Sequence, residues 1–167
     1  MPANTDWLAE CRNLCWRAKF VGEQISWIDR VNHEGALIAS SVMLDEDRVA
    51  IPGLQFHGEV QSRQYGPYQK YSLMLGRGGR KLRVFALEVM PLHKRSHVEK
   101  GLVIFGPHIQ LGDEREEGLS HVAKKVMTRL DERSINGWIA RFRRHARVYD
   151  SHDYPLLPPF SNDLFGL

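Results

Sequence analysis

The chain has little cysteine: Cys11 and Cys15 are the two among 167 residues. Two thiols cannot complete a Cys₄ metal site, and a domain of this size buries enough surface to fold without a metal or a disulfide. If residues 6–19 are helical, both thiols share one face with Trp7 and Leu14, at the spacing of a core stripe. We therefore expect a buried pair of free thiols in a cytoplasmic protein, with metal ligation by the pair as the alternative.

Long hydrophobic runs are also missing. The longest apolar stretches, 84–92 and 102–105, are strand-sized and far below the ~20 residues that a transmembrane helix needs. The first residues show no basic segment followed by an apolar one, so we expect no secretory signal. These absences favour a cytoplasmic protein without a membrane partner.

Two common catalytic loops are lacking as well. The glycine-rich run 76–80 has no Gly-Lys-Ser/Thr ending and stands between expected strands, so it predicts a hairpin and not a phosphate-binding loop. Ser40, Ser41 and Ser96 lack the context of a nucleophile elbow, which leaves serine hydrolase chemistry without support. We assign no cofactor from the sequence.

What the chain does have is an ordinary globular composition. Hydrophobic residues make up 43% and charged residues 26%, near the average of folded domains, and the length predicts one domain. The 23 basic and 20 acidic residues leave a formal charge of +3. This small excess permits anionic partners without requiring one.

The order of periodic segments predicts an α+β fold. We expect a helix over 6–19, a hairpin over 25–44, strands over 54–61, 70–75, 81–90 and 102–105, and a loop over 92–100. From Asp113 the period becomes helical up to Leu130, with Asp113 and Glu116 spaced as a capping box. A further helix is expected after Ser134, whose apolar stripe is Ile135, Trp138, Ile139, Phe142 and Ala146.

The predicted architecture is therefore an antiparallel β-sheet with an N-terminal helix and two C-terminal helices packed on one face. Residues 1–150 are expected to form this single domain. Residues 151–167, rich in proline, are expected to form an extended C-terminal tail.

Histidines provide the first candidate site, because His93, His97 and His108 flank one short apolar strand. If that strand returns across the sheet, the three imidazoles meet at one sheet end. One hypothesis is a metal-independent, ribonuclease-like site in which they act as acid, base and orienting group. The alternative is a zinc or iron site completed by Glu99 or Asp113. Loop histidines are also common as plain surface residues, and the sequence leaves these interpretations open.

Basic residues provide the second candidate site, because they cluster in two segments. Counterion release rewards such clusters on a phosphate backbone, and arginine suits bidentate phosphate contacts. Acidic runs at 45–47 and 113–117 restore a nearly neutral chain, and arginines on a helix are often simply solvated. The predicted nucleic-acid-binding residues are Arg77, Arg80, Lys81, Lys94, Arg95, Arg141, Arg143, Arg144 and Arg147.

The run 82–89, followed by Pro91-Leu92-His93 and then by residues 106–113, resembles small uncharacterised bacterial families of mobile elements. Those families show a Gly-Pro-His-x-His type motif after a similar strand, and Gln110 stands here at the position of the second histidine. The resemblance covers the middle third of the chain. It implies a bacterial cytoplasmic accessory protein without a defined activity.

The leading hypothesis is thus a small cytoplasmic bacterial accessory protein that acts on or with nucleic acid or a nucleoprotein complex. One alternative is a protein-binding inhibitor or adaptor of a mobile element, which would contact its partner through residues 154–167. The other is a metal-binding enzyme that uses the histidine cluster.

Overall fold

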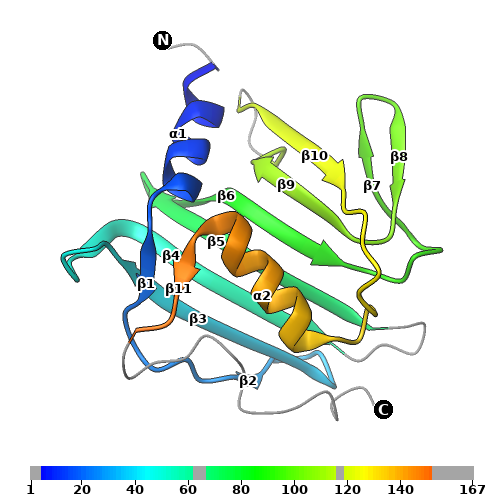
Figure 1. The fold of residues 1–167 in the computed structure, drawn as a ribbon, viewed down its shortest axis with the longest axis horizontal. Helices are drawn as coiled ribbons and strands as arrows, with labels where there is room; N and C mark the ends of the chain where they lie inside the picture. The colour runs from blue at the N-terminus through cyan, green and yellow to red at the C-terminus, as the bar shows by residue number, and fades with distance from the viewer. Residues whose placement is uncertain (1–4, 62–66, 116–118, 152–167) are drawn as a thin grey trace.

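The computed structural model describes residues 5–61, 67–115 and 119–151, which form a broad sheet with two helices on one face (Figure 1). The helices are α1 (Thr5–Trp16) and α2 (Ile135–Ala146). The strands are β1 (Lys19–Val21), β2 (Ile28–Asp29), β3 (Ala36–Leu44), β4 (Ala50–Gln61), β5 (Tyr68–Arg77), β6 (Arg80–Val89), β7 (Arg95–Glu99), β8 (Leu102–Phe105), β9 (His108–Gly112), β10 (His121–Lys125) and β11 (Val148–Tyr149).

Most of the sheet is antiparallel. Its strand order is β10-β9-β6-β5-β4-β3-β1-β11, with β2 paired to β3, and the β1–β11 pair is parallel. Strands β7 and β8 form a separate two-stranded hairpin. Helix α1 packs on β6 and β9, and α2 on β5 and β6, so both cover the same face. The opposite face is left for polar side chains.

Alternation along β4 separates these two faces, as the sequence predicts. Phe56 and Val60 are fully buried under the helices, whereas His57 and Glu59 between them are half-buried on the other face. Residues on one face of a strand repeat every second position, so this pattern fixes which side becomes the core. The predicted 76–80 hairpin is also confirmed, since it joins β5 to β6.

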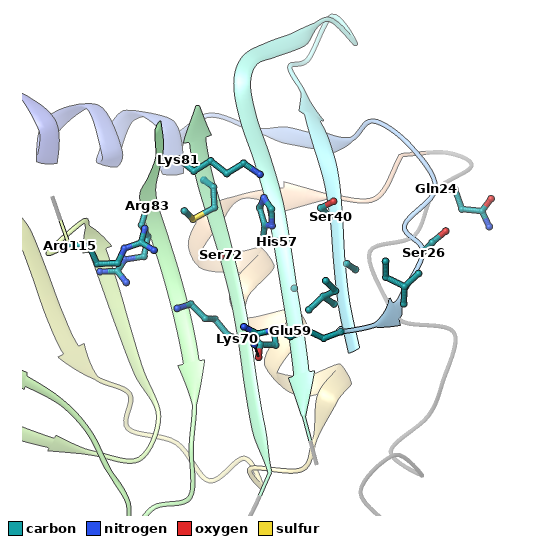
Figure 2. Close-up of a pocket in the computed structure, with 16 residues that line it drawn as sticks. Gln24, Ser26, Ser40, His57, Glu59, Lys70, Ser72, Lys81, Arg83 and Arg115 are labelled. Carbon is teal, nitrogen blue, oxygen red and sulfur yellow. Dashed lines mark hydrogen bonds and ion pairs between the residues drawn. The ribbon is translucent and has the colours of Figure 1, made fainter. Parts of the chain in front are cut away.

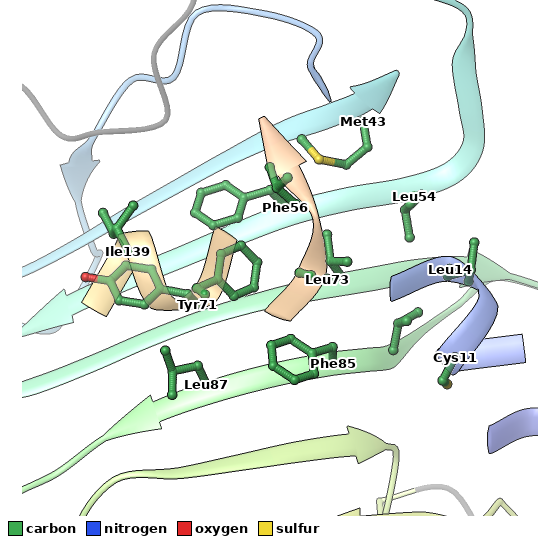
Figure 3. Packing of buried hydrophobic residues seen from close by; sticks show 14 of the residues in the cluster. Cys11, Leu14, Met43, Leu54, Phe56, Tyr71, Leu73, Phe85, Leu87 and Ile139 are labelled. Carbon is green, nitrogen blue, oxygen red and sulfur yellow. The ribbon is translucent and has the colours of Figure 1, made fainter. Parts of the chain in front are cut away.

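Helix α2 buries the stripe that the sequence predicts for it: Ile135, Trp138, Ile139, Phe142 and Ala146. Phe142 packs against the rings of Phe56 and Phe85, with centroids 5.6 and 6.0 Å away. Figure 3 shows how the buried side chains of β3 to β6 meet the two helices. The core therefore lies between the helices and the centre of the sheet.

Helix α1 ends at Trp16, three residues before the predicted end, because Lys19 folds back on it. The fully buried Lys19 Nζ donates to the carbonyl oxygens of Leu14 and Arg17, the latter at 2.6 Å. These carbonyls belong to the last helical turn and its exit, where acceptors lack partners within the helix. Lys19 thus caps α1 and begins β1.

The predicted helix over 113–130 is wrong, and the described residues contain one C-terminal helix in place of two. Gly112 has a φ of 83°, a left-handed conformation that favours glycine, and the chain returns as β10 antiparallel to β9. Asp113 is fully buried and accepts a hydrogen bond from the Arg83 backbone N–H at 2.7 Å, so it caps no helix. The apolar residues whose spacing predicted this helix do not form one buried stripe: Val126 lies in the core, whereas Val122 is 39% and Met127 78% exposed.

The expected loop over 92–100 contains β7, the first strand of the β7–β8 hairpin. The expected strand over 102–105 is confirmed as β8. Nearly all of the predicted tail, including the proposed partner segment 154–167, lies outside the described residues. Neither described helix has the length and apolar character needed to cross a membrane.

Candidate metal centre

The candidate site lies on the sheet face that the helices leave open. The β7–β8 hairpin contacts β10, and His97 of β7 stacks on His108 of β9 with ring centroids 5.4 Å apart. In the β9–β10 register Gly112 is opposite His121, so His121 shares this face with His108 and Gln110. Strands β7, β9 and β10 therefore gather three imidazoles at one end of the open face.

His97, Glu99 and His121 form a group whose ligand atoms all lie within 4.8 Å of one another. The Glu99 Oε2 atom is 3.5 Å from His97 Nε2 and 3.3 Å from His121 Nε2. In a tetrahedral zinc site with bonds of about 2.1 Å, neighbouring ligand atoms are about 3.4 Å apart. The Glu99 carboxylate is thus spaced from each imidazole as neighbouring ligands of such a site are.

Within the part of the chain that the structure describes, His97 Nε2 and Glu99 Oε2 of this group are buried without a hydrogen-bond partner. Both side chains are only 12% exposed. A buried polar atom without a partner is costly, so such atoms in a native fold call for an explanation. A cation between the imidazoles and the carboxylate satisfies both atoms at once.

Gln110 lies behind the group, with its Nε2 atom 3.0 Å from His97 Nδ1 and 3.1 Å from His108 Nε2. It is 2% exposed, and its Oε1 atom meets no hydrogen-bond partner from residues 5–61, 67–115 or 119–151. The oxygen and nitrogen of a carboxamide occupy nearly the same space when the group turns over. Turned over, Gln110 accepts a hydrogen bond from His97 Nδ1–H, which leaves the Nε2 lone pair for a metal.

His108 supports the site without entering it. Its side chain is fully buried and its Nε2 atom is 3.9 Å from Glu88 Oε2. Burial lowers the pKa of His108, and the Glu88 carboxylate opposes this effect without reversing it. A neutral imidazole beneath His97 adds no positive charge that would repel a cation.

A second carboxylate reaches the group from the turn after β9. Glu114 Oε2 is 3.9 Å from His97 Nε2 and 2.9 Å from the guanidinium of Arg83. Neighbouring Asp113 stabilises this turn through its hydrogen bonds. Burial raises the pKa of Asp113, but hydrogen bonds from the Arg115 side chain and the Arg83 backbone outweigh burial and keep that pKa far below its usual range. Arg83 therefore links the group to the centre of the sheet.

A basin of about 650 Å³ lies beyond Arg83 on the same face (Figure 2). Strands β3 to β6 form its floor, residues 24–30 form one wall, and Arg115 stands at the side of the histidine group. The volume is within the range of small-molecule sites. The basin thus reaches Arg83, whose guanidinium pairs with Glu114 beside the metal-ligand group.

No protein-family model, curated protein or solved structure matches this chain. Its function must be inferred from the geometry of the site.

The structure brings together part of the predicted histidine site. His97 and His108 meet as expected, but His93 is exposed in the turn before β7 and does not belong to the group of ligand atoms. His108 cannot touch a substrate as acid or base, because it has no exposed surface. Glu99 takes the position foreseen for a completing carboxylate, whereas His121 was missed because it fell inside the wrongly predicted helix.

The predicted nucleic-acid-binding residues do not share one surface. Lys81 lines the basin, whereas Arg141, Arg143, Arg144 and Arg147 belong to α2 and the residue after it, on the opposite side of the sheet. Arg77 and Arg80 pair at the β5–β6 hairpin, away from Lys94 and Arg95 beyond the other end of β6. Some also have structural partners: Arg77 pairs with Glu10, and Arg147 donates to the Trp16 carbonyl at 2.9 Å.

Proposed function

We propose that the protein is a metal-dependent enzyme that holds a zinc-class divalent cation at His97, Glu99 and His121. The observation that carries the proposal is the pair of distances from Glu99 Oε2 to the two imidazoles, 3.5 Å to His97 Nε2 and 3.3 Å to His121 Nε2. Of these atoms, Glu99 Oε2 and His97 Nε2 are buried without a hydrogen-bond partner among the described residues. Two imidazoles and one carboxylate suit zinc, and also iron(II), with positions left open for water or substrate.

The reaction class that fits these residues best is hydrolysis. A bound cation supplies a polarised substrate oxygen or a water of lowered pKa. Glu114 is a further carboxylate, 3.9 Å from His97 Nε2, so its Oε2 atom would be the proton acceptor beside the cation. Arg83 holds Glu114 at 2.9 Å and is 3% exposed, which fixes the direction of the carboxylate.

A reducing, cytoplasmic setting is part of this proposal. Cys11 and Cys15 are free thiols, and Cys11 is fully buried in the core. Free thiols persist in the cytosol, where disulfides are rare.

The test is metal loading of the purified protein. We expect one zinc ion per chain by elemental analysis, and titration with zinc after chelator treatment should restore it. Glu99→Gln and His121→Ala should each lose stoichiometric zinc, whereas His93→Ala, an exposed histidine outside the group, should keep it. Zinc binding that is absent in the wild type, or unchanged in both site variants, would exclude this centre.

Nucleic-acid binding is the second candidate function, and one hollow favours it. Trp16 is 75% exposed, the Arg147 guanidinium lies 5.3 Å from its ring centroid, and Arg143, Arg144 and Tyr149 complete a hollow of about 420 Å³. Exposed aromatic rings beside arginines suit the stacking of unpaired bases on a positive surface. This hollow is on the opposite side of the sheet from the metal centre.

A salt titration with a labelled single-stranded RNA tests this second function. We expect affinity that falls with ionic strength, and a loss of about tenfold in Trp16→Ala, since stacking on one base contributes about 1–3 kcal/mol. Arg144→Gln should also weaken binding, whereas Arg129→Gln, an exposed loop arginine outside the hollow, should not. Binding that is absent at low salt, or equal in all three variants, would rule the hollow out.

A further inference from the structure

The charges around the basin are paired, with one exception. Four of its five cationic side chains have a carboxylate partner, in the pairs Arg30–Glu59 at 2.6 Å, Lys70–Glu88 at 2.8 Å, Arg83–Glu114 at 2.9 Å and Arg115–Asp113 at 2.6 Å. Among the residues described, Lys81 has no such partner. The basin therefore carries one uncompensated positive charge.

That charge is directed over the basin floor. Figure 2 shows the Lys81 side chain extended across β5 toward His57. Burial lowers the pKa of His57, and the charge of Lys81 lowers it further. An anion placed between the two groups would attract Lys81 and favour protonation of His57, so both could contribute positive charge to one ligand.

Hydroxyl and apolar groups complete the floor. Ser40 and Ser72 line the basin beside His57, and their hydroxyl groups are the kind of donor that binds phosphate oxygens. Ile28, Ile38 and Met74 line the same basin. Polar donors and apolar side chains together suit a ligand with an anionic group on an apolar body.

We propose that the basin binds a small organic phosphate monoester, with its phosphate group at Lys81, His57 and Ser72 and its apolar body over Ile28 and Ile38, which pair across β2 and β3. The inference deepens the proposed enzyme function and rests on it for the reaction, because the basin reaches Arg83, the partner of Glu114 beside the metal centre. The binding step itself needs no metal. Commitment to phosphate follows from the Lys81 cation, the His57 ring and the hydroxyl donors of Ser40 and Ser72, which converge on one place.

The test measures binding of phenyl phosphate to chelator-treated protein by calorimetry. We expect phenyl phosphate to bind, benzoate to bind at least tenfold more weakly, and phenol not to bind. Lys81→Gln should weaken the phosphate complex by about tenfold or more, since hydrogen bonds to charged groups contribute about 1.5–3 kcal/mol. Lys124→Gln, an exposed lysine on β10 outside the basin, is the matched control and should bind as the wild type does.

Zinc loading and phosphate binding of two variants separate this inference from the metal proposal. Glu99→Gln should lose zinc and still bind phenyl phosphate, whereas Lys81→Gln should keep zinc. Equal binding of phenol and phenyl phosphate, tighter binding of benzoate, or an unchanged affinity in Lys81→Gln would overturn the phosphate site. If the wild type loads zinc normally but does not bind phenyl phosphate, the phosphate site is also refuted, whereas the metal centre is not.

Discussion

At the scale of single residues, Gln110 has to satisfy different needs with and without a metal. In the structure its amide nitrogen faces both His97 Nδ1 and His108 Nε2, which requires lone pairs on both ring atoms. A metal on His97 Nε2 places the proton on Nδ1, and the carboxamide then has to present its oxygen. In the proposed centre, Gln110 thus has a supporting role behind His97.

Gln110→Leu should therefore weaken zinc affinity by about 10- to 100-fold, as loss of a residue that orients a ligand usually does. Gln110→Glu should retain or strengthen the affinity, because a carboxylate accepts from Nδ1–H without turning over. Competition with a chromophoric chelator measures both. Gln55→Leu, on the same sheet face but outside the group, is the control, and an unaltered affinity in Gln110→Leu would refute the role.

The thiols give a prediction for alkaline pH. Burial, followed by the neighbouring Cys15 and Glu10, raises the pKa of Cys11 to about 12 from 9.0. Because the folded-state pKa is the higher one, this stabilisation is complete below pH 9 and is lost as pH rises toward 12. The free energy of unfolding should fall above pH 9, by at most about 1.4 kcal/mol per pH unit for this thiol.

Urea unfolding at pH 8 and pH 10.5 measures this effect. Cys11→Ala should be less stable than the wild type at pH 8 because it leaves a small cavity in the core. The difference between the two proteins should shrink at pH 10.5. If the difference in free energy of unfolding between the two proteins is the same at both pH values, ionisation of the buried Cys11 thiol does not cause the loss of stability.

The site was only partly predictable from single residues. Strand β8 separates His97 and Glu99 from His108 in the sequence. Because β8 runs back antiparallel to β7, this short segment brings the three side chains together. His121 comes from β10, and its place depends on the β9–β10 register. No local pattern near His121 specifies that register, because it depends on pairing with Gly112, nine residues earlier in the chain.

At the scale of elements, the success of a prediction depended on what each element buries. Helix α2 and strand β4 have one fully buried face, so their periods of 3.6 and 2 are clear in the sequence. Strand β10 is the edge of the sheet, and its residues are half-buried or exposed. Its apolar residues therefore carry no information about a core, and their helical spacing was misleading.

Gly112→Ala should disturb this edge. The residue has a φ of 83°, and an added Cβ would lie 2.2 Å from the carbonyl oxygen of Ser120. The substitution should displace β10, lower the free energy of unfolding by more than the ~1–2 kcal/mol of left-handed strain alone, and weaken zinc binding through His121. Gly79→Ala has a similar φ of 75° with open space around its Cβ, so it should show the strain and keep the zinc affinity.

Chemical unfolding and zinc titration of the two alanine variants decide between strain and displacement. Equal losses of stability, with equal zinc affinities, would mean that the β9–β10 turn does not position His121.

At the scale of the whole molecule, the sheet divides two tasks between its faces. The helix face carries the apolar core, and the open face carries a series of ion pairs that leads from Arg30–Glu59 through Lys70–Glu88 to Arg83–Glu114. Ligands for the proposed cation come from β7 and β10, elements that lie in two different sheets. A cation bound there would therefore fasten the β7–β8 hairpin to the edge of the main sheet.

This arrangement predicts that zinc stabilises the folded chain. A ligand that binds only the folded state adds about 2.7 kcal/mol at a free concentration of 100 times its dissociation constant. For a chain of this size that corresponds to a rise in Tm of about 5–10 °C. Calorimetric scans should show this rise for the wild type and for Lys81→Gln, whose metal ligands are intact, and no rise for Glu99→Gln. A zinc-dependent shift of equal size in Glu99→Gln would mean that the metal binds elsewhere, because the lost carboxylate joins both imidazoles of the centre.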